Sequence, residues 1–241
     1  WITANPVADF LLMYSAEIRY LCMLAYCFLH GCKIFGSFKG EDSPTYKFVR
    51  LVFQCTGGGI LVPILINGIP VSLGNDAYPI AIMASYILHT YLPILRDMAN
   101  RSPVLKSALI VLFETQRASV VVKLTTAAAA AIPASEFAFP LFGPIFCGSI
   151  AGCGGAFLPL DKGLAPLEKG LAPNMWSAFV AALCYHLFVS TSLSDGILDA
   201  PKKAQVCVAS FFILYGLAKE VGTSMFTIKV NETTTKKPKK E

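Results

Sequence analysis

Three charged residues stand well inside one long apolar segment of this 241-residue chain, and their spacing restricts the chemistry they can do. Glu114, Arg117 and Lys123 all fall within residues 104–132, a segment long enough to span a bilayer as a helix. A charge at the bilayer centre costs at least about 2.5–3.5 kcal/mol. Glu114 and Arg117, three residues apart, share one helical face, which is typical of a structural ion pair. An arginine at this depth also suits bidentate phosphate recognition, so a polar conduit or headgroup site is the second interpretation.

Two glycine-rich segments that superpose at an offset of 96 residues form the second feature. Their members are Gly57, Gly58, Gly59 and Pro63 in the first segment, and Gly152, Gly154, Gly155 and Pro159 in the second. Glycine costs roughly 1 kcal/mol against alanine inside a helix, and proline removes a backbone hydrogen bond. Close helix packing is one explanation. The sharper prediction is a break or kink of the helix in each half; membranes tolerate broken backbone only where it is buried in protein or lines a water-filled cavity.

The composition places these residues in a membrane protein. The chain is 55% hydrophobic and only 15% charged, whereas soluble domains are roughly 45–50% apolar and about 25% charged. This excess argues against an ordinary soluble enzyme and against a disordered chain. Hydropathy predicts an all-α polytopic membrane protein with seven transmembrane helices, at about 8–30, 48–67, 79–96, 104–132, 138–159, 173–193 and 204–227.

The basic residues predict the orientation of these helices. Fourteen of them lie in the predicted loops and tail on one side of the membrane, against only Lys202 and Lys203 on the other. The positive-inside rule then puts the C-terminus in the cytosol and the N-terminus in the lumen. Both glycosylation sequons, at Asn100 and Asn231, fall on the cytosolic side, so neither is expected to carry a glycan. Because this charge reports orientation, no nucleic-acid partner is expected.

The internal repeat predicts the organisation of the chain. A charged pair occurs in the same order in each half, as Glu17 to Arg19 and as Glu114 to Arg117. Since three helices are an odd number, two copies must insert with opposite orientation, as in many transport proteins. The predicted units are residues 1–98 (first three-helix repeat), 99–195 (second, inverted repeat), 196–228 (seventh helix) and 229–241 (cytosolic lysine-rich tail).

Enzyme and metal chemistry find little support in the sequence. We find no nucleophile elbow, P-loop, HExxH motif or paired catalytic carboxylates, and the three histidines stand alone. The eight cysteines have no metal-ligand spacing and are interpreted as buried small apolar residues in a reducing compartment. We therefore predict no catalytic residue, no metal site, no organic redox cofactor and no soluble substrate.

With these features in place, nearly the whole chain resembles the trimeric intracellular cation channels of the endoplasmic and sarcoplasmic reticulum. The resemblance lies in the seven helices, the glycine segments of the second and fifth, and the polar fourth helix. The stretch Tyr86-Ile87-Leu88 to Pro93 is similar to the family's third-helix segment. The family's fourth helix carries a Lys-Glu-Val-x-Arg segment that contributes to a phosphoinositide site. Here Phe113-Glu114-Thr115-Gln116-Arg117 matches its Glu and Arg, with phenylalanine at the lysine position, and Lys123 is expected to supply the missing charge.

The resemblance implies a homotrimer in the reticulum or nuclear membrane, with a pore for potassium in each subunit giving counter-ion current during calcium release. It also implies bound phosphatidylinositol 4,5-bisphosphate as a structural lipid. The implied lipid-binding residues are Arg117, Glu114, Lys123, Gly152, Gly154 and Gly155, and the implied pore or helix-break residues are Gly57, Gly58, Gly59, Pro63, Gly154, Gly155 and Pro159. The main alternative is an inverted-repeat secondary transporter that binds a small substrate at the glycine breaks. A seven-helix receptor lacks the repeat, and an intramembrane enzyme lacks a catalytic dyad.

Overall fold

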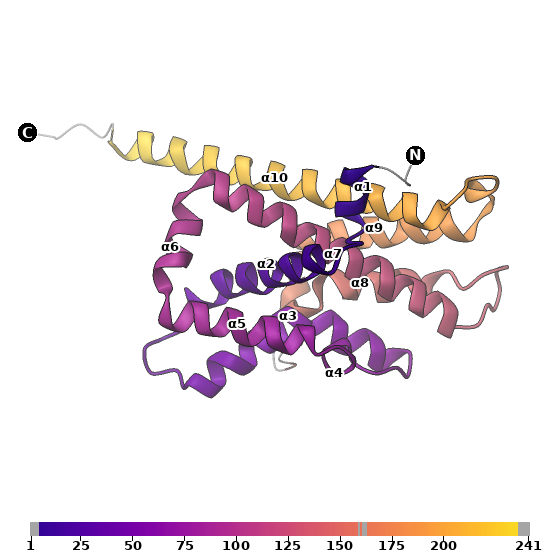
Figure 1. Cartoon of the computed structure of the whole chain (residues 1–241), viewed down its shortest axis with the longest axis horizontal. Coiled ribbons are helices and arrows are strands. Elements are labelled where there is room, and N and C mark those ends of the chain that lie inside the picture. Colours follow the sequence, from indigo (N-terminus) through magenta and orange to yellow (C-terminus); the bar gives the residue numbers. More distant parts are fainter. Residues whose placement is uncertain (1–4, 159, 161–162, 236–241) are drawn as a thin grey trace, which may run out of the picture.

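The structure is a computed structural model that describes residues 5–158, 160 and 163–235, with side chains as far as residue 222. Helices, and no strands, make up the regular structure of these residues (Figure 1). The α-helices are α1 (Pro6–Leu11), α2 (Ala16–Phe35), α3 (Pro44–Leu65), α4 (Val71–Gly74), α5 (Ala77–Tyr91), α6 (Pro93–Arg101), α7 (Pro103–Ala131), α8 (Phe142–Cys153), α9 (Pro173–Ser190) and α10 (Ala200–Thr235). Short 3₁₀ helices occur at η2 (Gly154–Ala156), η4 (Ala165–Leu167) and η5 (Ser192–Ser194).

Each of the seven predicted segments coincides with a helix or a pair of helices, but two predicted spans are divided. The first is divided because Met13 adopts a φ of 53° and Ser15 then caps a new helix, so α1 and α2 are separate. The third is divided at Pro93 into α5 and α6, which meet at 91°. The seventh helix extends to Thr235, beyond its predicted end, and residues 236–241 of the tail lie outside the described residues.

Serine and proline residues determine where the long helices begin. The hydroxyl of Ser43 accepts a hydrogen bond from the amide of Tyr46, and Pro44 occupies the first turn of α3. Ser102 accepts from the amide of Leu105 at 3.3 Å at the start of α7, which confirms the cap predicted there. These caps satisfy amides that have no partner within the helix, and proline needs no such partner.

The helices α2, α3 and α10, the last counted as far as Gly222, are long and apolar enough to cross a bilayer. The bent pair α5–α6 qualifies when it is treated as one broken span. The longest of the other helices, α7, has 29 residues but carries Lys106, Glu114, Arg117 and Lys123, so it needs polar partners inside the protein. The chain is thus a multi-pass membrane protein; the count of seven crossings and the inverted repeat stay predictions.

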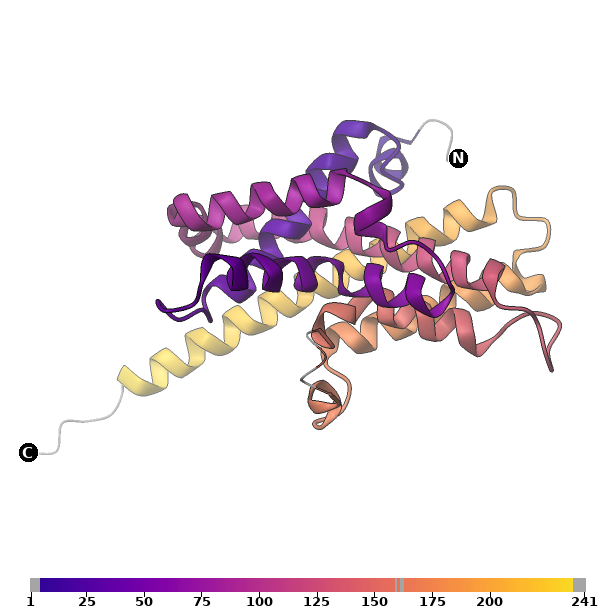
Figure 2. The ribbon, with the colours of Figure 1, turned by 90° about the horizontal axis from the view of Figure 1, so that it is seen from below.

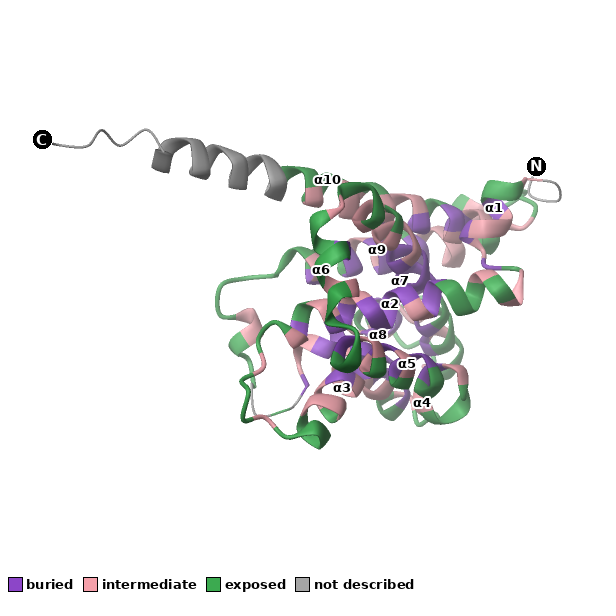
Figure 3. Ribbon diagram, turned by 60° about the vertical axis from the view of Figure 1, so that its left-hand side comes forward, coloured by how far each residue is buried: buried purple, intermediate pink, exposed green. Residues whose placement is uncertain are grey.

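The central helix of the bundle is α7, which packs against α2, α8, α9 and α10 (Figures 1 and 2). One apolar core joins α7 to α8, α9 and α10 around Val121, Ala182 and Phe212. A second core joins α2, α3 and α5 around Leu51 and Ile82. Buried residues concentrate around α7, where it packs against α2 and α8, and the outer faces are exposed (Figure 3). The polar face of α7 therefore lies between the two cores.

Candidate functional site

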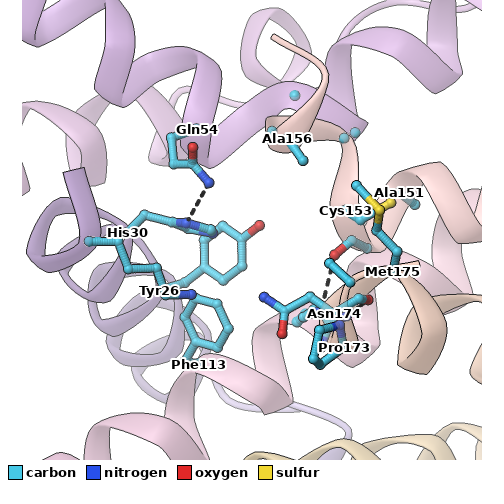
Figure 4. Close-up of a pocket in the computed structure, with 18 of the residues that line it drawn as sticks. Tyr26, His30, Gln54, Phe113, Ala151, Cys153, Ala156, Pro173, Asn174 and Met175 are labelled. Carbon is cyan, nitrogen blue, oxygen red and sulfur yellow. Dashed lines mark hydrogen bonds between the residues drawn. The ribbon is translucent and has the colours of Figure 1, made fainter. Parts of the chain in front are cut away.

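A cavity of about 200 Å³ lies where α2, α3, α7, the end of α8 and the start of α9 come together. Figure 4 shows Tyr26, His30, Gln54 and Phe113 facing Cys153, Asn174 and Met175 across this space. Arg117 also lines it. The cavity thus forms at the place predicted for a polar site, on the fourth long apolar segment.

The two glycine segments meet directly at one wall of the cavity. A Cβ atom on Gly57 would collide with the backbone of Gly154 and Gly155, and one on Gly58 would collide with the backbone of Ala151. A Cβ on Gly155 would likewise strike the backbone of Gln54. The neighbours are backbone atoms, which cannot rotate away, so this crossing of α3 with α8 and η2 requires glycine.

The predicted helix interruption is present in the second glycine segment only. There α8 ends at Cys153 and gives way to the 3₁₀ turn η2. In the first segment no break occurs, because α3 continues through Gly57 to Gly59 and includes Pro63 near its end; the predicted kink there stays a prediction. Close packing accounts for Gly57 and Gly58, since these two have the backbone contacts. Pro159 lies outside the described residues.

Arg117 holds the broken end of α8 against the start of α9. Its Nε donates to the carbonyl of Gly152 at 3.0 Å, and its NH2 group donates to the Asn174 carbonyl and to Ser177 Oγ, the latter at 3.0 Å. Its NH1 group forms an ion pair with Glu114 at 3.1 Å. These contacts engage four of the five N–H groups of a guanidinium. Arg117 is only 3% exposed, so the ion pair with Glu114, rather than solvent, neutralises its charge.

The predicted Glu114–Arg117 ion pair is therefore formed, and it is buried on both sides. Glu114 is 7% exposed. The guanidinium also stacks over the ring of Phe212 on α10, with 4.3 Å between its carbon and the ring centroid. The attraction within a buried ion pair offsets the cost of desolvating it only when further hydrogen bonds satisfy the remaining polar atoms. Here the carbonyls of Gly152 and Asn174 accept hydrogen bonds from the guanidinium.

Lys33 of α2 is a site residue that the sequence did not reveal. Its ammonium lies 4.8 Å from the centroid of Phe113, the residue that occupies the family's lysine position. The ring of Phe113 stacks on that of Tyr26, with 4.9 Å between the ring centroids. The ring centroid of His30 lies 5.1 Å from that of Phe113, and its Nδ1 lies 3.4 Å from Nε2 of Gln54. Lys33 stands in the last turn of an apolar helix. In the sequence that position is typical of a cation at the membrane edge. The one hint of a site was that Lys33 follows His30 by three residues, which places both side chains on one face of the helix.

A second cavity, of about 260 Å³, shares Lys33, Phe113, Asn174 and Lys219 with the first. Glu114 borders this second space as well. At its edge, the ammonium of Lys106 on α7 and the carboxylate of Glu220 on α10 form an ion pair at 2.6 Å.

Lys123, the third predicted charge of this helix, borders a different cavity from Arg117. It borders a third, smaller cavity of about 60 Å³, which shares Tyr26, Gly58 and Ala151 with the first. Six residues separate Lys123 from Arg117, which corresponds to about 9 Å along α7. Its ammonium does not line the cavity that contains Arg117, so among the described residues Lys33 and Lys219, rather than Lys123, bring further positive charge to that cavity.

Comparisons with known proteins identify the fold. No protein-family model matches the chain, and no curated protein matches it. A solved structure of a trimeric intracellular cation channel from C. elegans, determined in the absence of Ca²⁺, superposes with a TM-score of 0.66 and 19% identity over 89% of this chain and 96% of that one. A second structure, described as showing the basis of conductance through TRIC cation channels, superposes with a TM-score of 0.58 and 17% identity over 92% and 95% of the two chains. The chain thus shares the fold of these channels, as its resemblance to them implied.

Proposed function

We propose that this chain is a passive channel for monovalent cations, mainly potassium, in the membrane of the endoplasmic or sarcoplasmic reticulum. The observation that supports it best is the succession of three cavities along α7, each sharing lining residues with the next. From Lys106 to Lys123 this succession follows about 25 Å of helix, comparable to the roughly 30 Å of a bilayer's hydrocarbon core.

The glycine crossing gives this route its narrow point. Gly58 and Ala151 border both the first and the third cavity. A Cβ on Gly57 or Gly58 would strike the backbone of η2 or α8, so the two backbones are in direct contact here. We propose that ions pass beside this contact and that the helix end at Cys153 leaves room for them.

The positive lining of the first cavity calls for an anionic partner if cations are to pass. We propose that phosphatidylinositol 4,5-bisphosphate occupies this cavity from the cytosolic leaflet. Its phosphates would lie near Arg117 and the start of α9, where a helix N-terminus favours anions. An anionic headgroup would offset the lysines and leave the route attractive to cations.

Assembly and orientation complete the proposal. The C. elegans structure with the same fold is a trimeric channel, and we propose a homotrimer here with one pore in each subunit. The basic residues support a luminal N-terminus and a cytosolic C-terminus. The channel would carry counter-ion current when calcium leaves the store.

A secondary transporter is the second candidate, because a helix that ends inside the bundle, as α8 does at Cys153, is also typical of midplane substrate sites. Potassium efflux from liposomes that contain the purified protein separates the two. A channel gives efflux that rises with the potassium gradient without saturating and needs no second solute. Saturating, obligatorily coupled flux would support the transporter instead.

A further inference from the structure

The charged side chains that line the first cavity are all of one sign among the described residues. Among the described residues that line it, Lys33, Arg117 and Lys219 are basic and none is acidic. The nearest carboxylate in the ion-pair network, Glu114, is bonded to Arg117. An anion is therefore the ligand that this lining favours, and the question is which side chain binds it.

Arg117 is poorly placed for that role despite its chemistry. Four of its five N–H groups are already bonded to Glu114, Gly152, Asn174 and Ser177. Binding a phosphate in the usual bidentate manner would break at least one of these bonds and leave a buried acceptor without its donor. Such a loss costs roughly as much as the new bond provides.

Lys33 has the opposite properties. Its ammonium is held by the ring face of Phe113, a cation–π contact that leaves all three N–H donors for other partners. No ion pair among the described residues involves it. It lines both the first and the second cavity, so its charge lies where they join.

The start of α9 adds an independent reason to expect an anion beside Lys33. This 18-residue helix begins at Pro173, has no side-chain cap, and its first residues line the same cavity. An uncapped helix N-terminus carries roughly half a positive charge. Lys219 of α10 also lines this cavity, and its ammonium lies 3.5 Å from the side-chain oxygen of Asn174 in the first turn of α9.

We infer that Lys33 is the residue that binds the phosphate of the ligand directly, opposite the start of α9, and that Arg117 is a positioning residue that fixes the helix ends. A phosphate monoester carries about −1.5 to −2 charges at neutral pH, which suits one lysine and a helix N-terminus. In this chain the cation comes from α2 and lies over Phe113, instead of projecting from position 113 itself. The inference rests on the proposed function, because it names the ligand contact of the same cavity.

The test compares binding to phosphatidylcholine vesicles with and without phosphatidylinositol 4,5-bisphosphate, and binding of soluble inositol trisphosphate. Lys33→Gln is expected to weaken binding about 10- to 100-fold, the effect of one lost hydrogen bond between charged groups. Returning the cation in Lys33→Gln/Phe113→Lys is expected to restore most of it, and Lys33→Arg to retain it. Lys39→Gln, in the loop after α2, is the matched control and should bind as the wild type does. Tighter binding of vesicles than of inositol trisphosphate identifies a lipid; equal affinity identifies a headgroup ligand.

The outcomes separate this inference from the proposed function. Wild-type binding that Lys33→Gln leaves unchanged overturns the role of Lys33 while the lipid site stands. A wild type that binds neither probe removes the phosphoinositide from the proposed function and this inference with it. Lys33→Gln must also keep the wild-type melting temperature in detergent. If its free energy of unfolding falls by as much as its free energy of binding, Lys33 is merely structural.

Discussion

Replacing Arg117 by glutamine is expected to destabilise the protein strongly. The guanidinium is 3% exposed and bonds to four groups from three parts of the chain: Glu114 on its own helix, Gly152 at the end of α8, and Asn174 and Ser177 at the start of α9. Removing one partner of a buried ion pair costs about 3–5 kcal/mol, because the other charge stays buried without compensation. The freed carbonyls of Gly152 and Asn174 add to that cost.

The double variant apportions the loss. Glu114→Gln/Arg117→Gln no longer buries an unpaired carboxylate, so it should recover about 1–3 kcal/mol relative to Arg117→Gln alone, as expected for residues that couple directly. It should remain less stable than the wild type, because the carbonyls of α8 and α9 still lack their donor. The difference between the two variants therefore separates the ion pair from the tie between the helix ends.

The assay is thermal unfolding of the purified protein in detergent, followed by size-exclusion chromatography. A chain of 150–250 residues changes its melting temperature by about 2–4 °C per kcal/mol, so the loss corresponds to a shift of roughly 6–20 °C. Lys33→Gln is the control, since its ammonium forms no ion pair among the described residues. A shift for Arg117→Gln no larger than that of the control would refute the positioning role.

Two further predictions follow from the cavities and from the glycine crossing. Gly58→Ala should prevent normal packing of α3 on α8 and lower stability by about 1–3 kcal/mol, because its Cβ meets the backbone of Ala151; Gly59→Ala, whose Cβ would meet only the Val71 side chain at 3.3 Å, is the matched control. Equal melting temperatures for the two would contradict this account of the crossing. Lys123→Gln should change single-channel conductance without altering phosphoinositide affinity, because Lys123 borders only the third cavity; reduced lipid binding would contradict that placement.

Periodicity and composition were sufficient to predict where the helices lie, because apolar segments between turn residues leave few alternatives in a membrane chain. The start of α7 at Ser102 and Pro103 follows from local capping chemistry, which the sequence states directly. The break between α1 and α2 could not be predicted in this way. It depends on the positive φ of Met13, and methionine carries no preference for that conformation.

The site was predictable in part, for similar reasons. Glu114 and Arg117 were found because two charges in an apolar segment at i, i+3 spacing have few explanations. Their partners Gly152, Asn174 and Ser177 are distant in sequence, and only the packing of α8 and α9 on α7 brings them together. Lys33 was missed, and the cavity that Lys123 borders could not be predicted, because the sequence shows which helix carries a charge but not which neighbouring helix it faces. Likewise, a run of glycines such as that in α3 looks the same in the sequence whether it bends the helix or allows a neighbouring backbone to approach closely.

Potassium current through the purified protein in a planar bilayer is the decisive measurement. With a potassium gradient across a phosphatidylcholine membrane that contains phosphatidylinositol 4,5-bisphosphate, the wild type should give discrete, ohmic single-channel currents whose reversal potential follows the potassium gradient. Membranes without the phosphoinositide should give markedly less current. Properly folded protein that gives no unitary current in the presence of the lipid, while carrying saturable coupled flux in liposomes, would contradict the channel and favour the transporter.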